Sequence, residues 1–174
     1  MPTEVKGALA LRKALRQFSP ELAKETQKEI ANFIKPVVRQ ARGYMPSNAD
    51  VPSGWVLGTQ KGKWERIAYD STIARRGIGY KTTPSRANRR GFQALVSILN
   101  KSAAGAVYET AGRKSGVQGR FSPKLGGQIV GQTQKTSGRA MFRAYTEDEG
   151  KAKAAVIQAI FNAANKLNMK AYRG

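Results

Sequence analysis

The chain has 174 residues, which is enough for one domain with a buried core. Its 31 lysines and arginines stand against only 11 acids, a formal charge of +20, so we expect a polyanionic partner. Cysteine and histidine are both absent, which excludes disulfides, thiol and imidazole catalysis, and zinc sites with sulfur or nitrogen ligands. No apolar run approaches the ~20 residues that span a bilayer, and the N-terminus lacks the apolar core of a signal peptide. We therefore expect a soluble protein that is used without export.

Two helices are predicted at the start of the chain. Residues 4–17 place leucines, alanines and a valine among basic residues at helical spacing, which is typical of a short amphipathic helix. Ser19 and Pro20 then supply a cap and a first-turn proline, so a second helix should begin there and end at Gly43. Pro36 lies inside this helix and removes one backbone hydrogen bond. We expect a kink at Pro36 or a break just before it.

Strands and loops are predicted for the following residues up to 110. Four stretches alternate apolar and polar residues or are rich in β-branched and aromatic types, which favours strands. These stretches are 64–69, 72–80, 92–99 and 106–108. A basic turn without any acid, residues 81–90, joins two of them. Residues 111–138 contain seven glycines and almost no apolar periodicity, so we expect a mobile loop or an arm that becomes ordered on assembly.

The last predicted element is a C-terminal helix. Thr146 stands three residues before Glu149, which is the spacing of a capping box, and the intervening acids suit the positive end of a helix dipole. Alanine and aliphatic residues then recur on one stripe with lysines beside it, which predicts an amphipathic helix over 146–170.

These elements predict a single α+β domain. Its antiparallel sheet would be packed by the kinked N-terminal helix and by the C-terminal amphipathic helix, with a long glycine-rich loop or arm. The domain would span residues 1–174, with helices in 1–43, strands and loops in 44–110, a flexible arm in 111–138 and the final helix in 146–170.

The positive charge is concentrated in the middle of the chain. Residues 71–146 hold fourteen lysines and arginines and one acid, Glu109. We interpret this block as a surface that faces phosphates or an acidic protein ring; the alternative is that scattered cations only keep the protein soluble. Contacts with DNA would be to its backbone, because the basic residues lie in glycine-rich segments and not on a recognition helix. The residues expected to contact the acidic partner are Arg75, Arg76, Arg86, Arg89, Arg90, Arg113, Lys114, Arg120 and Lys124.

Enzymatic chemistry has little support in the sequence. Glu65, Asp70 and Glu109 are the acids of the sheet region that could converge on a metal, but pairing with nearby arginines explains the first two. The glycine pairs lack the lysine and the serine or threonine of a phosphate loop. We therefore expect no enzymatic activity, no metal and no cofactor. Phe121 could stack a nucleic-acid base, or it could anchor the arm on a neighbouring subunit or on the domain itself.

The order of these features resembles the small tail-completion or head-tail joining proteins of long-tailed bacteriophages, the broad group that includes the tail-completion protein of phage lambda. Met45-Pro46 and Ser53-Gly54 match the turn that ends the first long helix of that family, although with a longer spacer. Residues 103–112, Ala-Ala-Gly-Ala-Val-Tyr-Glu-Thr-Ala-Gly, are similar to its Tyr-Ala-x-x-Val-Glu-x-Gly segment. Residues 139–144, Arg-Ala-Met-Phe-Arg-Ala, are similar to its Pro-Phe-hydrophobic-Arg-Pro-Ala box, with both prolines missing.

The resemblance implies a structural virion protein. Its subunits would form a ring, expected to be a hexamer, between the head portal and the tail tube, around the channel through which DNA leaves. The implied partners are further copies of the chain, neighbouring neck and tail-tube proteins and the DNA in the channel, with no membrane. The protein would be found in the virion neck or tail, and in the host cytoplasm during assembly. Subunit contacts are expected at Phe121, Phe142 and Arg143. The alternative is a non-enzymatic protein that binds the phosphate backbone of nucleic acids without sequence specificity.

Overall fold

The computed structural model describes residues 7–51, 68–89, 91, 93–110 and 138–173. In these residues the chain forms six helices and a small two-stranded antiparallel sheet, which is a mostly helical α+β arrangement. The chain divides into two compact units, and the division falls inside one long helix. Unit 1 consists of Met1–Pro36, Tyr80–Ser97 and Gly150–Gly174, and unit 2 of Val37–Gly79 and Ile98–Glu149.

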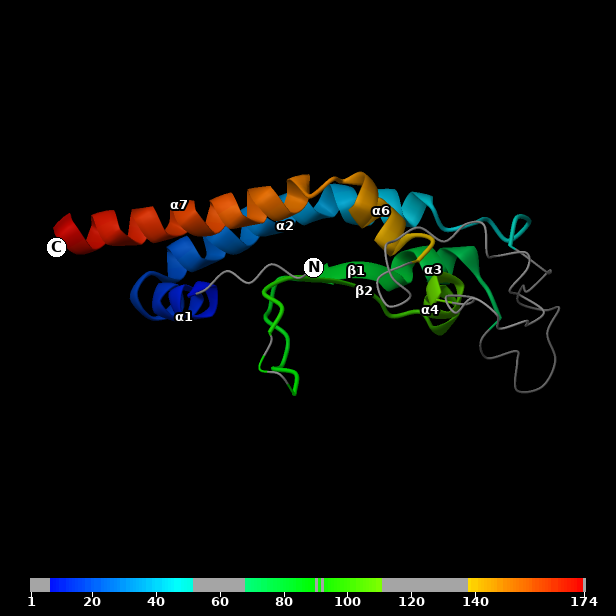
Figure 1. The fold of residues 1–174 in the computed structure, drawn as a ribbon, viewed down its shortest axis with the longest axis horizontal. Coiled ribbons are helices and arrows are strands. Elements are labelled where there is room, and N and C mark those ends of the chain that lie inside the picture. Colours follow the sequence, from blue (N-terminus) through cyan, green and yellow to red (C-terminus); the bar gives the residue numbers. More distant parts are fainter. Residues whose placement is uncertain (1–6, 52–67, 90, 92, 111–137, 174) are drawn as a thin grey trace. The chain divides into compact units, whose positions relative to one another are not determined.

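Unit 1 is built on three helices: α1 (Ala8–Phe18), the first part of α2 (Pro20–Gly43) and α7 (Lys151–Arg173). Figure 1 shows α7 running alongside the first part of α2, and α1 contacts α7. Leucines and alanines at helical spacing face one another across these helices, because burying their apolar surface stabilises the packing. The core residues are Leu15, Leu22, Ala23 and Ala163, with Leu11 and Leu167 packed against them.

The predicted boundaries of α2 are confirmed. The backbone N–H of Ser19 donates to Leu15 O (2.9 Å), and α2 begins at the next residue, Pro20, and ends at Gly43. The helix continues through Pro36, so the expected break before this residue is wrong, and the kink stays a prediction. A single proline removes one hydrogen bond, and the apolar face on both sides of it keeps the helix continuous.

Unit 2 contains three short helices: α3 (Ser71–Gly77), α4 (Ala103–Thr110) and α6 (Met141–Glu147). Helices α3 and α4 contact each other. The larger side chains at the centre of this unit include polar and charged groups beside aliphatic ones. They are Arg139, Tyr69, Met45, Ile78, Glu109 and Val37.

The sheet is formed by β1 (Ile78–Lys81) and β2 (Ser97–Asn100), which confirms strand for 78–80 and for 97–99. Residues 72–77, predicted as strand, instead belong to α3. Asp70 explains the difference, because its Oδ1 accepts a hydrogen bond from Ile73 N (2.8 Å) and caps the first turn of α3. Residues 93–96 are not in a strand, and most of the predicted strand 64–69 lies outside the described residues.

The strand predicted at 106–108 is also wrong, because these residues lie in α4. Its alanines favour a helix, and the hydroxyl of Ser102 accepts a hydrogen bond from Gly105 N (3.1 Å) at the helix start. Residues 111–137 lie outside the described part of the chain, so the arm expected at 111–138 stays a prediction.

The capping box predicted at the start of the last helix is wrong as well. Thr146 lies inside α6, where its hydroxyl donates to Phe142 O (2.9 Å) and so is engaged with the preceding turn. The chain then turns at Glu149 and Gly150, whose φ angles are 52° and 80°, and α7 begins at Lys151. The predicted helix is therefore confirmed from 151 onward, behind a turn that the sequence pattern did not predict.

Candidate basic interaction surface

A buried carboxylate connects two distant segments of unit 2. Glu109, at the end of α4, has a side chain that is 1% exposed. Its Oε2 accepts hydrogen bonds from the backbone N–H groups of Ala140 (2.8 Å) and Met141 (3.2 Å), and its Oε1 accepts one from Phe142 N (3.0 Å). These N–H groups begin α6 and have no partner within the helix, so Glu109 caps α6 from a position 31 residues earlier in the chain.

An arginine completes this connection from the other side. Arg139 is 2% exposed, and its Nη1 donates to Tyr108 O (2.6 Å) while its guanidinium lies 5.7 Å from the centre of the Tyr108 ring. We call the four residues Tyr108, Glu109, Arg139 and Ala140 the clasp. Gly138 lies against it: an added Cβ atom would lie 2.7 Å from Glu109 Cδ, closer than real Cβ atoms approach. Glycine is therefore required at this position.

Aromatic packing supports the clasp. The rings of Tyr69 and Tyr108 are 6.2 Å apart, and the Tyr69 hydroxyl donates to Pro46 O (2.9 Å). Burial raises the pKa of Tyr69 well above its ordinary value, and the neighbouring Tyr108 adds to the shift. Burial also raises the pKa of Tyr108. Both hydroxyls are therefore held in the neutral form.

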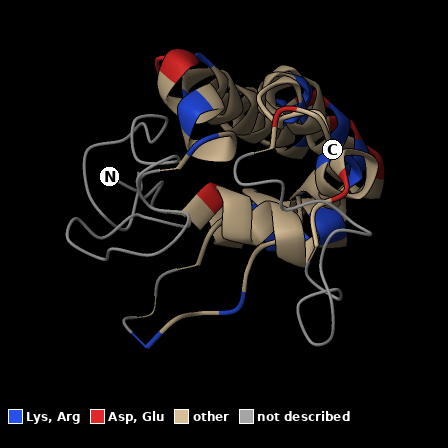
Figure 2. Cartoon of the chain, turned by 90° about the vertical axis from the view of Figure 1, so that its right-hand side faces the viewer, with Lys and Arg blue, Asp and Glu red and all other residues tan. Residues whose placement is uncertain are grey.

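The clasp removes the single acid of residues 71–146 from the surface. The cations of the same block behave differently, because several are exposed and have no ion-pair partner among the described residues. Figure 2 shows the loop between β1 and β2, at the bottom of the view, with blue segments and no red one. We call residues 82–96 the basic loop. In the part of the block that the structure describes, the exposed cations with no hydrogen-bond or ion-pair partner there are Arg76, Lys81, Arg86, Arg89 and Lys101.

The predicted contact residues fall into two groups. Arg86 and Arg89 lie exposed on the basic loop of unit 1, and Arg75 and Arg76 lie in the last turn of α3 in unit 2. Arg75 also has a structural contact, because its Nε (3.3 Å) and Nη2 (2.9 Å) both donate to Met45 O. The remaining predicted residues lie outside the described part of the chain. They are Arg90, Arg113, Lys114, Arg120, Phe121 and Lys124.

The two described residues expected at subunit contacts lie in α6. Phe142 is half-buried, and Arg143 is exposed and engaged within its own chain. The Nε of Arg143 lies 2.8 Å from Glu147 Oε1, and its guanidinium lies 4.1 Å from the centre of the Tyr44 ring. Glu147 also accepts hydrogen bonds from the Tyr44 hydroxyl and from Gln40 Nε2 (2.7 Å). Hydrogen bonds from Tyr44 and Arg143 hold the pKa of Glu147 below its ordinary value.

One arginine was missed by sequence reasoning. Arg12 of α1 is half-buried, and its Nη1 donates to the carbonyl oxygen of Thr82, the first residue of the basic loop. Its Nε and Nη2 atoms are buried and have no hydrogen-bond partner among the described residues. No signal in the sequence separates Arg12 from the other basic residues of this amphipathic helix, because its environment depends on a loop that follows 70 residues later.

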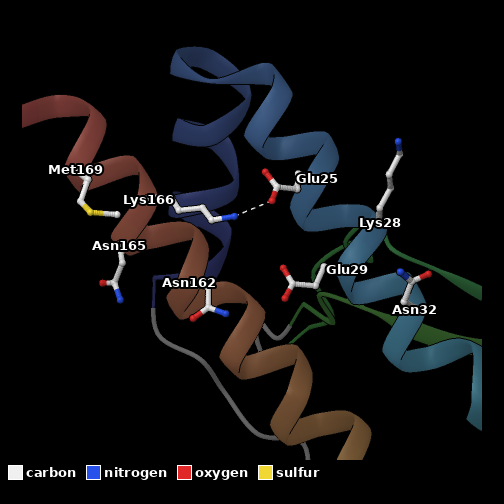
Figure 3. Close-up of a pocket in the computed structure, with 8 residues that line it drawn as sticks. All are labelled: Glu25, Lys28, Glu29, Asn32, Asn162, Asn165, Lys166 and Met169. Atoms are coloured by element: carbon white, nitrogen blue, oxygen red, sulfur yellow. Dashed lines mark hydrogen bonds and ion pairs between the residues drawn. The ribbon is translucent and has the colours of Figure 1, made fainter. Parts of the chain in front are cut away.

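A groove of about 530 Å³ lies between α2 and α7 in unit 1 (Figure 3). Figure 3 shows Lys166 of α7 reaching across to Glu25 of α2, and their charged atoms are 2.7 Å apart. This bond holds the pKa of Glu25 below its ordinary value. Two glutamates and two lysines line the groove, so their charges balance. The lining residues are Glu25, Lys28, Glu29, Asn32, Asn162, Asn165, Lys166 and Met169.

The described residues contain no group of three or more acidic, histidine or cysteine side chains that could hold a metal ion. Of the three acids considered for a metal site, Asp70 caps α3 and Glu109 caps α6, whereas Glu65 lies outside the described residues. None of the helices in the described ranges is both long enough and apolar enough to cross a membrane. Comparisons with protein-family models, with curated proteins and with solved structures give no match for the chain.

Proposed function

We propose that this chain is a structural subunit of a bacteriophage neck, a tail-completion or head-tail joining protein that forms a ring around the DNA channel. The observation that carries the proposal is that every charged side chain exposed in the described residues 71–107 is a lysine or an arginine. Five exposed lysines and arginines there have no hydrogen-bond or ion-pair partner among the described residues. Of the two acids that flank this range in sequence, Asp70 caps α3 and Glu109 is buried in the clasp. Unpaired cations at this density favour a polyanionic neighbour.

The clasp gives a second line of support. The two segments that carry the resemblance to tail-completion proteins are 103–112 and 139–144, and the clasp joins them through Glu109 and Arg139. A carboxylate that accepts three backbone hydrogen bonds constrains the backbone, because each of the three donors must stay within hydrogen-bond distance. The contact explains why both segments belong together in one structural unit.

The alternative function is a free nucleic-acid-binding protein that contacts the phosphate backbone without sequence specificity. Arg86 and Arg89 on the basic loop would serve this function equally well, since they are exposed and have no ion-pair partner in the described ranges. The two functions differ in self-assembly and in the strength of DNA binding. A neck subunit assembles into a closed ring of identical copies and binds free duplex DNA weakly at physiological salt.

The test measures both properties on the purified full chain. Light scattering and negative-stain electron microscopy should show a closed ring, with six subunits expected. Duplex DNA affinity should be measured from 50 to 200 mM salt, where each phosphate contact contributes a slope of about −0.9. A monomer that binds duplex DNA at nanomolar affinity in physiological salt would overturn the neck function in favour of the alternative.

Charge-reversal variants sharpen this test. Arg86→Glu with Arg89→Glu changes the basic loop, and Lys24→Glu with Lys28→Glu makes the same charge change on exposed positions of α2. If the basic loop meets the polyanion, only the first pair should abolish binding to DNA or to an acidic tail-tube protein. Equal losses of binding in both double variants would show that binding depends only on the net charge of the chain.

A further inference from the structure

Four arginines of this chain donate to backbone carbonyl oxygens, and one of them, Arg12, leaves two buried nitrogen atoms without an acceptor among the described residues. Arg42 donates from Nε (3.0 Å) and Nη2 (2.7 Å) to Ile78 O, and Arg75 donates from the same two atoms to Met45 O. Arg139 donates from Nη1 to Tyr108 O. Arg12 also donates from Nη1 to a carbonyl, that of Thr82, but its Nε and Nη2 have no acceptor among the described residues.

The unoccupied atoms of Arg12 form one edge of the guanidinium. The N–H groups of Nε and Nη2 point in parallel from the same side of the plane, and this edge matches two oxygens of a phosphate or a carboxylate. In Arg42 and Arg75 a backbone carbonyl occupies the equivalent edge. A buried edge without an acceptor costs folding free energy, so its presence requires an explanation such as a missing ligand.

The two elements that are described around Arg12, α1 and the basic loop, contain cations and no acid. Arg16 lies one turn further along α1, and desolvation together with the charge of Arg16 lowers the pKa of Arg12. The basic loop, which holds Arg12 through Thr82, carries Arg86 and Arg89 and contains no acid. α1 contains no acid either. The chain therefore supplies no carboxylate from these two elements, and an anion from outside would meet several cations at once.

We propose that the Nε and Nη2 edge of Arg12 is a binding site for a phosphate group of the DNA backbone. A row of phosphates suits a site that combines Arg12, Arg16 and the basic loop, because one carboxylate would neutralise only one of these charges. The proposal deepens the proposed function by naming the partner of the basic surface, and it rests on that function for the source of the DNA.

Access to the edge requires a rearrangement around Arg12, because both nitrogen atoms are buried. The loop is closed on itself by hydrogen bonds between Ser85 and Ala94, from Ser85 N to Ala94 O (2.8 Å) and from Ala94 N to Ser85 Oγ (2.9 Å). The proposal requires the contact between Arg12 and Thr82 O to open so that a phosphate can reach this edge. Once a phosphate is bound, two of its oxygens accept hydrogen bonds from the Nε and Nη2 atoms of Arg12.

The experiment compares Arg12→Lys, Arg12→Met and Lys13→Met, using a 20-base-pair duplex of mixed sequence and polyglutamate as probes. Arg12→Lys keeps the charge and loses the paired donors, so the DNA affinity should fall about tenfold, the value of one bidentate contact. Arg12→Met should lose at least as much. Lys13 is an exposed neighbour, so Lys13→Met removes the same charge and should change the affinity by no more than about twofold.

Melting temperatures without DNA supply a second measurement. Arg12→Met removes two nitrogen atoms that have no acceptor but also the hydrogen bond from Nη1 to Thr82 O, so the two effects oppose each other and the melting temperature should change little. DNA affinities of both Arg12 variants that equal that of Lys13→Met would overturn the proposal. So would a melting temperature that falls in Arg12→Met with unchanged affinity in Arg12→Lys, since that pattern belongs to a purely structural residue. Binding of polyglutamate, but not DNA, in an Arg12-dependent manner would also overturn it in favour of a protein carboxylate.

Ring formation of the same variants separates this proposal from the proposed function. If the unmodified chain forms rings but the Arg12 variants bind DNA as tightly as it does, the proposed site is wrong and the neck function is unaffected. If the chain stays monomeric and the Arg12 substitutions weaken DNA binding, the site is supported and the neck function is wrong.

Discussion

The two units of this chain are stabilised in different ways. Unit 1 packs leucines and alanines of three helices against one another, with Leu22 and Ala163 among the buried residues. Unit 2 places a glutamate, an arginine and a tyrosine among its most buried side chains, and Glu109 holds α6 by hydrogen bonds. Apolar packing tolerates small changes of shape, whereas a buried charge depends on each of its donors. Unit 2 should therefore be the more sensitive of the two to conservative substitutions.

The largest expected effect is that of Glu109→Ala. The change leaves three buried N–H groups at the start of α6 without an acceptor, so the free energy of unfolding should fall by about 4 kcal/mol. Urea denaturation followed by circular dichroism measures this value. Glu21→Ala changes an exposed acid in the first turn of α2 and should cost less than about 1 kcal/mol. Similar losses for both variants would contradict the role of the clasp.

The apolar counterpart in unit 1 is Leu22→Ala. This side chain is 5% exposed and contacts the core of α1, α2 and α7, so its truncation should lower the free energy of unfolding by about 3 kcal/mol. Leu9→Ala removes the same atoms from a side chain that is 39% exposed, and its effect should stay below about 1 kcal/mol. A larger loss from Leu9 than from Leu22 would show that the core is assigned to the wrong face of the helices.

A smaller effect separates two glycines. Gly138→Ala places a Cβ atom 2.8 Å from Phe142 Cδ2 and against the fixed carboxylate of Glu109, so we expect a loss of about 2 kcal/mol. Gly79→Ala meets no heavy atom within 4 Å and should change the free energy of unfolding by no more than about 0.5 kcal/mol. Chemical denaturation of both variants under one condition tests the difference, and equal values would refute the tight packing at Gly138.

The smallest expected effect concerns alkaline pH. Burial raises the pKa of Tyr69 and Tyr108 in the folded chain above the ordinary value of 10.0. The unfolded chain therefore loses these protons at a lower pH than the folded chain does. The resulting stability is complete below pH 10 and is lost as the pH rises further. Tyr69→Phe should lose about 1 kcal/mol at pH 7, because the bond to Pro46 O disappears, and should show a weaker decline above pH 10. Denaturation measured at pH 7 and pH 10.5 tests both statements.

Local patterns predicted unit 1 better than unit 2. The spacing of leucines and the Ser19-Pro20 start signal depend on neighbours within one or two turns, and they gave the correct helices. Residues 72–77 and 106–108 were misassigned as strands because their β-branched and aromatic side chains outweighed the cap signals of Asp70 and Ser102. These two caps were present in the sequence and could have corrected the prediction.

Of the candidate site, the sequence predicts the positive charge but not the contacts that surround it. The block of cations is visible in the sequence, and exposure of Arg76, Arg86 and Arg89 agrees with it. The burial of Glu109 depends on α6, 31 residues later, and the environment of Arg12 depends on Thr82, 70 residues later. Contacts at such separations leave no periodic pattern, because nothing local requires them.

The clasp also bears on how this chain can vary in length. Thr110 follows Glu109 directly and Gly138 precedes Arg139, so the clasp holds Thr110 and Gly138 close to one point of unit 2. In general, each doubling of the length of a loop between two fixed ends costs only about 0.6 kcal/mol. Variants with residues inserted between Thr110 and Gly138 should therefore keep unit 2 folded as long as the clasp is unchanged.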